Sequence, residues 1–364
     1  MVNAPSFAKI NLGLQIGTLR SDGFHELRTL YQTIALHDVV RVSVGRGSGI
    51  EIRCEDSRVP LDSTNTCYRA AERAMETLRA RGRVVIEIEK KLPVQGGLGG
   101  ASGNAVAAML ALEQALRKQL SSPDRLRIAA EVGSDLPLFL IGGTVLGVGR
   151  GEEVYPLPEL PALPCVIALP EVAVSTPQAF ADWDTMNASH CHSEPVSAGE
   201  ESAGSLLKAG SSRPSQARPL GMTGLGRKLK NPTPSDRMSE FSREISAWLT
   251  AASGEGGRRS GVSAKGGGRA ENLLLDLVRT GIENDFEKVV FPKHPELREV
   301  KRVLERAGAV YASLSGSGSA IYGLFSSRER AAAAAKKLEK HGTRAVITST
   351  LTRREYWDRL QILD

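Results

Sequence analysis

The stretch VQGGLGGASGNAVAAMLAL, Val94 to Leu112, carries five glycines in its first ten residues and none afterwards. Glycine has no Cβ, so a glycine-rich backbone can approach a phosphate group closely. The alanine-rich run that follows predicts a helix, and the first turn of a helix offers unpaired N–H groups and a partial positive charge. The pattern therefore favours a phosphate cradle in front of a helix. The alternative is a turn that only joins a strand to a helix.

Two common phosphate loops do not fit this stretch. The chain has no GxxxxGK[ST], hence no Walker A loop, and Ser102 stands where GxGxxG requires its third glycine. A phosphate loop without its own lysine takes positive charge from another segment, and Lys9 in the apolar SFAKINLGL could supply it. The alternative is a lysine on an edge strand or at the surface.

Composition narrows the class of protein. The 364 residues suit two lobes, and 41% hydrophobic with 24% charged residues is ordinary for a soluble globular chain. We see no apolar run long enough to cross a bilayer and no signal peptide, and the four cysteines stand far apart. We therefore expect a cytoplasmic protein without a membrane partner.

The segment Thr185–Ala270 differs from the rest of the chain. Gly and Ser supply 28 of its 86 residues, and it holds 12 Lys and Arg against 7 Asp and Glu. Such a composition predicts a disordered or loosely ordered insert, apart from one amphipathic helix over Ser235–Ser253. Because the remainder carries 35 basic and 34 acidic side chains, no nucleic-acid partner is expected. Within the insert, three adjacent ligands without a fourth are not expected to hold a metal: His190, Cys191 and His192.

Strand and helix patterns alternate irregularly outside the insert. Alternating β-branched residues in FAKINLGLQIG and RVVIEIEK predict strands, and SPDRLRIAAEVG predicts a helix with Ser122 as N-cap and Gly133 as C-cap. The order predicts an α+β protein of two lobes. GSDLPLFLIGG places Asp135 beside an apolar run, where structural capping is the alternative. SLSGSGSAIYGLF offers small side chains where a ligand or another backbone comes close.

These segments, in this order, resemble the three motifs of the GHMP kinase superfamily. Within it, FAKINLGLQIGTLRSDGFHEL is typical of the 4-diphosphocytidyl-2-C-methyl-D-erythritol kinases, and NTCYRAA and ENDFEKVV…HPEL resemble further blocks of that family. The resemblance covers Pro5 to about Trp183 and Glu271 to about Phe325. It implies a two-lobed GHMP kinase fold. The N-terminal lobe, 1–157, would resemble ribosomal protein S5 domain 2, and the C-terminal lobe, 158–364, would be ferredoxin-like and interrupted by the insert.

The resemblance also implies a reaction, in which the γ-phosphate of ATP moves to the 2-hydroxyl of 4-diphosphocytidyl-2-C-methyl-D-erythritol in non-mevalonate isoprenoid synthesis. It makes Lys9 and Asp135 the catalytic pair. The attacking hydroxyl must lose its proton to an acceptor, and Lys9 would keep Asp135 ionised for that role. Two alternatives stay open: a GHMP kinase for another small alcohol, and a non-catalytic nucleotide- or RNA-binding protein on an S5-like fold. A monomer or weak homodimer is expected.

The resemblance assigns the nucleotide-binding residues. Asn65 is expected to reach adenine, and the glycine loop is expected to hold ATP. That loop comprises Val94, Gln95, Gly96, Gly97, Leu98, Gly99, Gly100, Ala101, Ser102, Gly103 and Asn104. It departs from the family's GLGGGSS pattern at Ala101 and Gly103. Ser102 is therefore the hydroxyl left for phosphate or Mg²⁺.

A cytidine pocket follows from the same resemblance, lined by Asn11, Phe24, His25 and Phe180. A flat base would stack between Phe24 and Phe180 while hydrogen bonds recognise its edge. The alternatives are a core aromatic ring for Phe24 and a hydrogen-bonded buried imidazole for His25.

Overall fold

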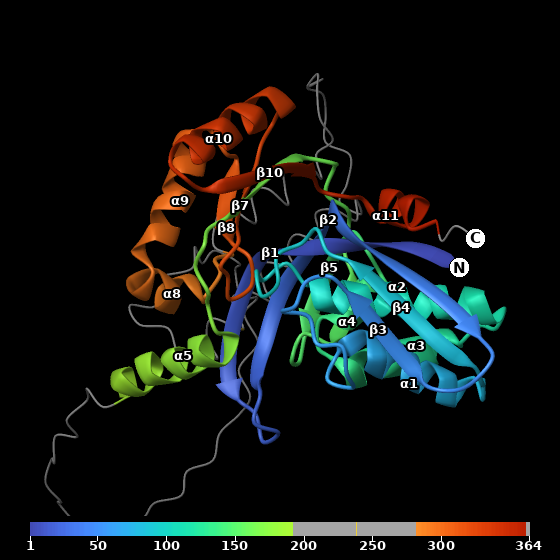
Figure 1. Cartoon of the computed structure of the whole chain (residues 1–364). Helices are drawn as coiled ribbons and strands as arrows, with labels where there is room; N and C mark the ends of the chain where they lie inside the picture. Colours follow the sequence, from blue (N-terminus) through green and yellow to red (C-terminus); the bar gives the residue numbers. More distant parts are fainter. Residues whose placement is uncertain (192–237, 239–281, 362–364) are drawn as a thin grey trace, which may run out of the picture.

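The computed structural model describes residues 1–191, 238 and 282–361, which form two lobes built on separate sheets (Figure 1). The first lobe holds a six-stranded sheet in the order β3-β4-β2-β5-β6, with β1 paired to β2. Its strands are β1 (Val2–Leu19), β2 (His25–Gly45), β3 (Ile50–Cys54), β4 (Arg83–Glu89), β5 (Thr144–Val148) and β6 (Glu153–Pro156). Only β3 and β4 pair in parallel within this sheet, because a helical crossover joins them.

Helices cover one face of this sheet (Figure 1). They are α1 (Thr66–Thr77), α2 (Gly100–Leu116), α3 (Ser122–Val132) and α4 (Leu136–Phe139). The helix predicted after the glycine loop is confirmed as α2, and it is buried from Gly103 to Glu113. Its many alanines allow close packing against β1, β2 and α1. The glycine loop is thereby fixed to the centre of the lobe.

The second lobe holds a four-stranded antiparallel sheet in the order β10-β7-β9-β8. Its strands are β7 (Pro164–Leu169), β8 (Tyr311–Leu314), β9 (Ile321–Leu324) and β10 (Arg344–Ser349). Its helices are α5 (Thr176–Cys191), α8 (Glu287–Lys293), α9 (Pro295–Arg306) and α10 (Arg328–Lys340). The α+β class and the two lobes are therefore confirmed.

Packing crosses the predicted boundary at residue 157 in both directions. The last helix, α11 (Arg353–Arg359), follows the second lobe in sequence but packs on the first, where the Tyr356 ring lies 5.3 Å from the Phe7 ring. In return, Leu14 and Ile16 of β1 belong to the hydrophobic core of the second lobe. The boundary stays a prediction, since each lobe borrows an element from the other part of the chain.

Two boundaries differ from the sequence-based predictions. The N-cap of α3 is Ser121 instead of Ser122, while Gly133 is the C-cap as predicted. The helix α5 runs to Cys191, so the first residues of the Thr185–Ala270 segment are helical, against the prediction of disorder. The rest of that segment, including His192 and most of the predicted helix, lies outside the described residues. Met238 is described, and it is buried.

Two structural features are absent from the described part of the chain. It contains no helix long and apolar enough to span a membrane. Nor does it contain a group of three His, Cys, Asp or Glu side chains placed to hold a metal ion.

Candidate active site

The glycine loop lies at very short range against the Ser–Gly segment SLSGSGSAIYGLF (Ser313–Phe325), which resembles the third motif of the superfamily. Gly97 has φ +75° and Gly99 has φ +69°, a left-handed conformation that glycine adopts without strain. A Cβ on Gly97 would stand 2.0 Å from the backbone oxygen of Ser315. Glycine is therefore required at this position for two independent reasons, the sign of φ and the approach of another backbone.

Hydrogen bonds fix the loop to both neighbouring motifs. Lys9 N donates to Leu98 O at 2.9 Å from β1. From the third motif, Ser315 Oγ donates to Gly97 O at 2.9 Å and Ala320 N donates to Gly96 O at 3.2 Å. The close backbone approach predicted for SLSGSGSAIYGLF is confirmed. These bonds occupy loop carbonyl groups, whereas the N–H groups of Gly97, Gly99 and Gly100 make no such backbone hydrogen bond within the described residues.

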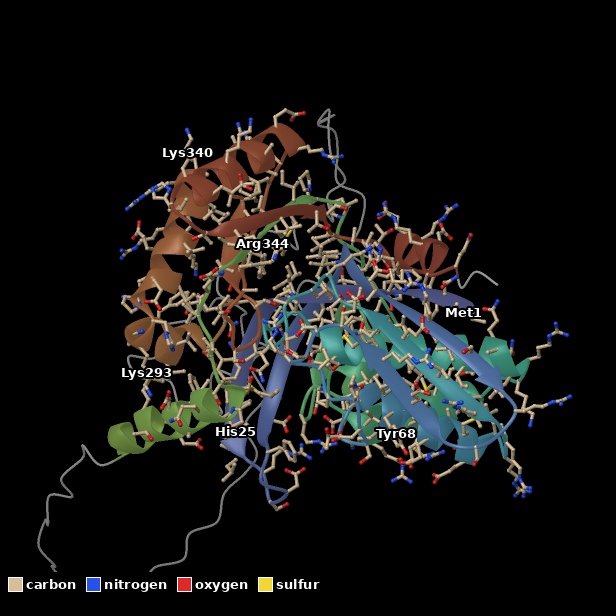
Figure 2. The ribbon with its side chains drawn as sticks, in the orientation of Figure 1. Met1, His25, Tyr68, Lys293, Lys340 and Arg344 are labelled. Atoms are coloured by element: carbon tan, nitrogen blue, oxygen red, sulfur yellow. The ribbon has the colours of Figure 1, made fainter. Side chains whose placement is uncertain are left out.

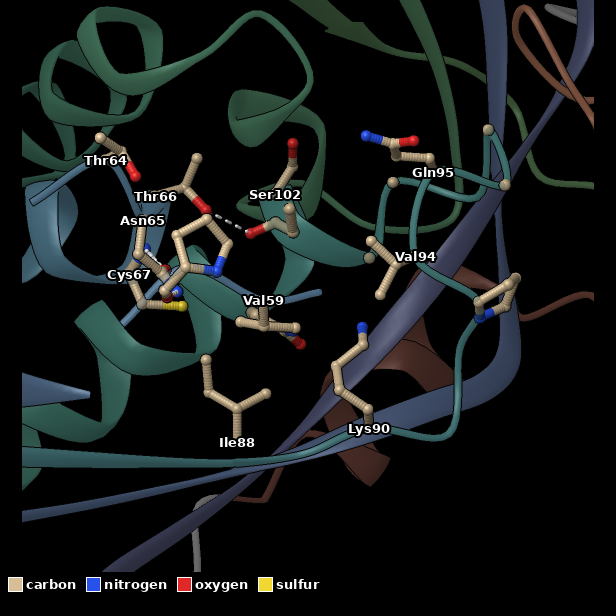
Figure 3. A pocket seen from close by; sticks show the side chains of 18 residues that line it. Val59, Thr64, Asn65, Thr66, Cys67, Ile88, Lys90, Val94, Gln95 and Ser102 are labelled. Atoms are coloured by element: carbon tan, nitrogen blue, oxygen red, sulfur yellow. Dashed lines mark hydrogen bonds between the residues drawn. The ribbon is translucent and has the colours of Figure 1, made fainter. Parts of the chain in front are cut away.

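A cavity of about 340 Å³ opens beside the loop, between the ends of β4, α1 and α2 (Figure 3). Lys90 is the one charged side chain in its lining among the described residues. Its amino group lies 3.3 Å from where a Cβ on Gly100 would stand, at the first turn of α2. The glycine loop therefore has a cation beneath it. Lys90 was not identified from the sequence, because the charged run Glu89–Lys91 at the end of a strand is typical of exposed surface residues.

Asp38 holds this part of the cavity together. Its side chain is fully buried and forms an ion pair with Lys90. It also accepts hydrogen bonds from the backbone N of Lys91 at 2.6 Å, from the backbone N of Leu92 at 2.7 Å and from Asn104 Nδ2 at 3.1 Å. One carboxylate thus joins the segment before the glycine loop to the helix after it.

Asn65, Asn104 and Ser102 line the same cavity, whereas Leu98 and Gly103 of the predicted loop do not. Asn65 is the N-cap of α1: its Oδ1 accepts from Cys67 N at 2.8 Å and its Nδ2 donates to Pro60 O at 2.6 Å. That amide is therefore already hydrogen-bonded. Asn104 Oδ1, by contrast, is buried and has no hydrogen-bond partner among the described residues. Ser102 lies in the first turn of α2, partly exposed (Figure 3).

Lys9 and Asp135 meet where the loop faces the second lobe. Lys9 Nζ lies 3.2 Å from Asp135 Oδ2, and their side chains are 4% and 30% exposed. The surface alternative for Lys9 is therefore wrong. The capping alternative for Asp135 also fails, because this side chain makes no capping hydrogen bond to α4. A buried ammonium group is paired with a carboxylate that still reaches solvent.

Two polar side chains orient this pair. Asn11 Oδ1 accepts from Lys9 Nζ at 2.7 Å, and Asn11 Nδ2 donates to Thr29 Oγ1 at 2.8 Å, which sets the direction of the amide. The Tyr31 hydroxyl donates to Asp135 Oδ1 at 2.9 Å. Burial, and next the charge of Asp135, raise the pKa of Tyr31 well above its ordinary value, so this phenol stays protonated and remains a donor. Nothing in the sequence marked Tyr31.

A larger cavity of about 650 Å³ opens from the pair toward α5 and contains all four residues of the predicted cytidine pocket. His25 lies where the β1–β2 hairpin approaches α5 (Figure 2). Its Nε2 is 2.7 Å from Asp184 Oδ1, and its ring stacks on Phe180 with centroids 4.9 Å apart and planes 11° apart. His25 therefore covers one face of the Phe180 ring, and the stacking of a base between Phe24 and Phe180 stays a prediction. Phe24 is 50% exposed on the cavity rim.

Known proteins resemble the chain over most of its length. Models of the GHMP kinases N terminal domain and of the GHMP kinases C terminal match residues 65–143 and 269–344. A 4-diphosphocytidyl-2-C-methyl-D-erythritol kinase of Solibacter usitatus (strain Ellin6076) is 34% identical, over 89% of this chain and 81% of its own. One of Acaryochloris marina (strain MBIC 11017) is 31% identical, over 91% and 89%. A crystal structure of 4-(cytidine 5'-diphospho)-2C-methyl-D-erythritol kinase, 26% identical, matches 96% of this chain and 98% of its own with a TM-score of 0.63.

Proposed function

Since the chain belongs to the family of 4-diphosphocytidyl-2-C-methyl-D-erythritol kinases within the GHMP kinases, we propose that it phosphorylates the 2-hydroxyl of that compound. It is an ATP-dependent kinase of the non-mevalonate isoprenoid pathway. The observation that carries the proposal is the Lys9–Asp135 pair at 3.2 Å. That pair lies between a glycine loop suited to phosphates and a cavity large enough for a nucleotide-sized acceptor.

The pair accounts for the chemistry. The 2-hydroxyl oxygen attacks the γ-phosphorus, its bond to phosphorus forms as the bond to the leaving oxygen of ADP breaks, and the hydroxyl proton passes to Asp135. Lys9 pairs with Asp135 before the transfer and balances charge on the phosphoryl oxygens. Tyr31 donates to one oxygen of Asp135 and Lys9 faces the other, so the carboxylate is held in one orientation for the proton transfer.

We propose that ATP lies along the glycine loop, with its phosphates on the loop N–H groups and the start of α2. Mg²⁺ fits this site through oxygen donors. Ser102 offers a hydroxyl, and no carboxylate lines the 340 Å³ cavity among the described residues, so phosphate oxygens and water would complete the six ligands that Mg²⁺ prefers. When bound, Mg²⁺ would neutralise charge on the transferring phosphoryl group.

The acceptor side of the proposal concerns the cytosine. The Nδ1 of His25 has no hydrogen bond to any described residue, and it could recognise the base edge while Nε2 is held by Asp184. Phe24 offers an open ring face for stacking. Phe180 stacks on His25, so we expect it to affect cytosine binding by holding the imidazole in position.

A coupled ADP-release assay with purified protein tests the function. We expect turnover with 4-diphosphocytidyl-2-C-methyl-D-erythritol and none with methylerythritol phosphate, mevalonate or homoserine. A site built to hydrogen-bond a base discriminates by about 10⁴ against compounds that lack it. Equal turnover of mevalonate or homoserine would favour a GHMP kinase for another small alcohol.

We further propose a cytoplasmic enzyme that works as a monomer or weak homodimer without a nucleic-acid partner. The near balance of basic and acidic residues outside 185–270 supports the last point. Light scattering across a range of protein concentrations tests the oligomeric state.

A further inference from the structure

The turn between β5 and β6 forms part of the rim of the 650 Å³ cavity and places Arg150 there. The turn is held firmly: Leu27 N donates to Gly149 O at 2.6 Å, and Gly151 N donates to Val148 O at 2.9 Å. A Cβ on Gly151 would stand 2.6 Å from the Tyr31 hydroxyl. The position of Arg150 is therefore fixed relative to the residues around Asp135.

The Arg150 side chain is oriented by two contacts. Its Nε donates to Glu152 Oε1 at 3.0 Å, while its backbone N donates to Glu152 Oε2 at 2.6 Å. Its guanidinium carbon lies 5.0 Å from the centroid of the Phe24 ring. A guanidinium face on an aromatic ring is a favourable arrangement. Arg150 and Phe24 thus form one wall of the cavity.

Two other basic side chains in the cavity lining each have protein partners. Lys9 is bonded to Asn11 and Asp135, and His25 is bonded to Asp184. The two terminal amino groups of Arg150, by contrast, make no hydrogen bond to residues 1–191, 238 or 282–361. A ligand in the cavity can therefore bind both groups without displacing a described protein partner.

We propose that Arg150 binds the diphosphate of the substrate through these terminal amino groups and so determines specificity for a nucleoside diphosphate. The inference rests on the proposed function. A planar guanidinium matches two phosphate oxygens at once. The arrangement also fits the ligand, because the diphosphate follows the base by one ribose and Arg150 adjoins the ring proposed to stack on that base. Glu152 holds the guanidinium in place and occupies only its Nε.

Ligand pairs that differ only in the diphosphate test the proposal. With the nucleotide pocket saturated by ADP, calorimetry compares CDP with cytidine on wild-type protein and on Arg150→Gln. We expect Arg150→Gln to reduce the preference for CDP over cytidine by about 10- to 100-fold, with cytidine affinity and the KM for ATP unchanged. The matched control is Arg20→Gln, because the Arg20 guanidinium pairs with Asp22 and Glu26 outside the cavity lining. It should keep the full preference.

Other outcomes overturn the proposal. Equal weakening of CDP and cytidine would mean that Arg150 only supports Phe24, and an unchanged preference would mean no contact at all. Arg150→Lys keeps the charge but cannot bind two phosphate oxygens at once, so it should lose part of the preference for CDP over cytidine. This variant tests the proposal even if Arg150→Gln does not fold. If Arg150→Lys keeps the full preference, binding of two oxygens by the guanidinium is contradicted. If wild-type protein binds CDP in this way but does not phosphorylate the cytidine compound, the proposed function fails while the Arg150 contact stands.

Discussion

The two cavities meet at Gly97 and Gly99 but are built from different parts of the chain. The smaller cavity, proposed to bind the nucleotide, is lined by left-handed glycines of the loop, the N-terminus of α2 and the cation Lys90. The larger cavity is made of side chains: a Lys–Asp pair, a tyrosine, an imidazole and an aromatic ring. Substitutions in the smaller cavity should therefore act by changing the shape of the glycine loop. Substitutions in the larger cavity should each remove the function of one side chain.

The largest effect is expected from Asp135→Asn. The amide keeps the shape of the carboxylate but cannot accept the hydroxyl proton, and loss of a general base lowers turnover by about 10²- to 10⁴-fold. ATP affinity should change little, because Asp135 lines the larger cavity only. Single-turnover kinetics with separate ATP-binding measurements check both points. Turnover close to wild type would place the base elsewhere.

The next effect is expected from Gly97→Ala, which tests the shape of the loop. The added Cβ would stand 2.0 Å from Ser315 O, so the loop must move, and a displacement near 1 Å can lower the rate by about 10²-fold. Gly342→Ala is the control, since Gly342 has a similar φ of +77° and nothing within 4 Å of the added Cβ. It shares the backbone strain of about 1 kcal/mol without the clash. Equal kcat/KM for ATP in the two variants would contradict the claim that the shape of the glycine loop determines ATP binding.

A smaller effect, confined to the other cavity, is expected from Phe24→Ala. Stacking of a base on an aromatic ring contributes about 1–3 kcal/mol, so the KM for the cytidine substrate should rise by about 5- to 150-fold. The KM for ATP should stay the same, because Phe24 does not line the nucleotide cavity. If ATP binding weakens instead, the assignment of the two cavities is reversed.

Much of this comparison could be predicted from the sequence, because its chemistry is local. The glycine loop, the Asp135 segment and the Ser–Gly third motif each carry their signal within a dozen residues. Helices with clear periodicity were also predictable. Errors fell at boundaries, as with Ser121 instead of Ser122 at the start of α3 and with the extent of α5, since neighbouring serines cap equally well and helices can continue into polar sequence.

The residues that were missed depend on pairing between distant strands. Tyr31 reaches Asp135 because the β1–β2 register places it opposite Asn11 after an irregularity in the strand. Lys90 lies beneath the glycine loop because Asp38, 52 positions earlier, is fully buried beside it. A bulge or a one-residue shift in register would send these side chains to the other face. No local pattern fixes that register.

The smallest effect concerns Cys67, a side chain in the wall of the nucleotide cavity. Burial raises the pKa of this thiol from 9.0 to about 12. The unfolded chain therefore releases this proton first, and the stability associated with the neutral thiol is complete below pH 9 and is lost as the pH rises toward 12. Between pH 8 and pH 10 the loss amounts to about 1 kcal/mol.

Denaturant unfolding of wild-type protein and of Cys67→Ala at both pH values measures this loss of stability. The variant should lose about 1 kcal/mol less than wild type over this interval, and its KM for ATP at pH 8 should be unchanged if this wall serves packing alone. A marked rise in that KM would show that side chains, as well as backbone, bind the nucleotide.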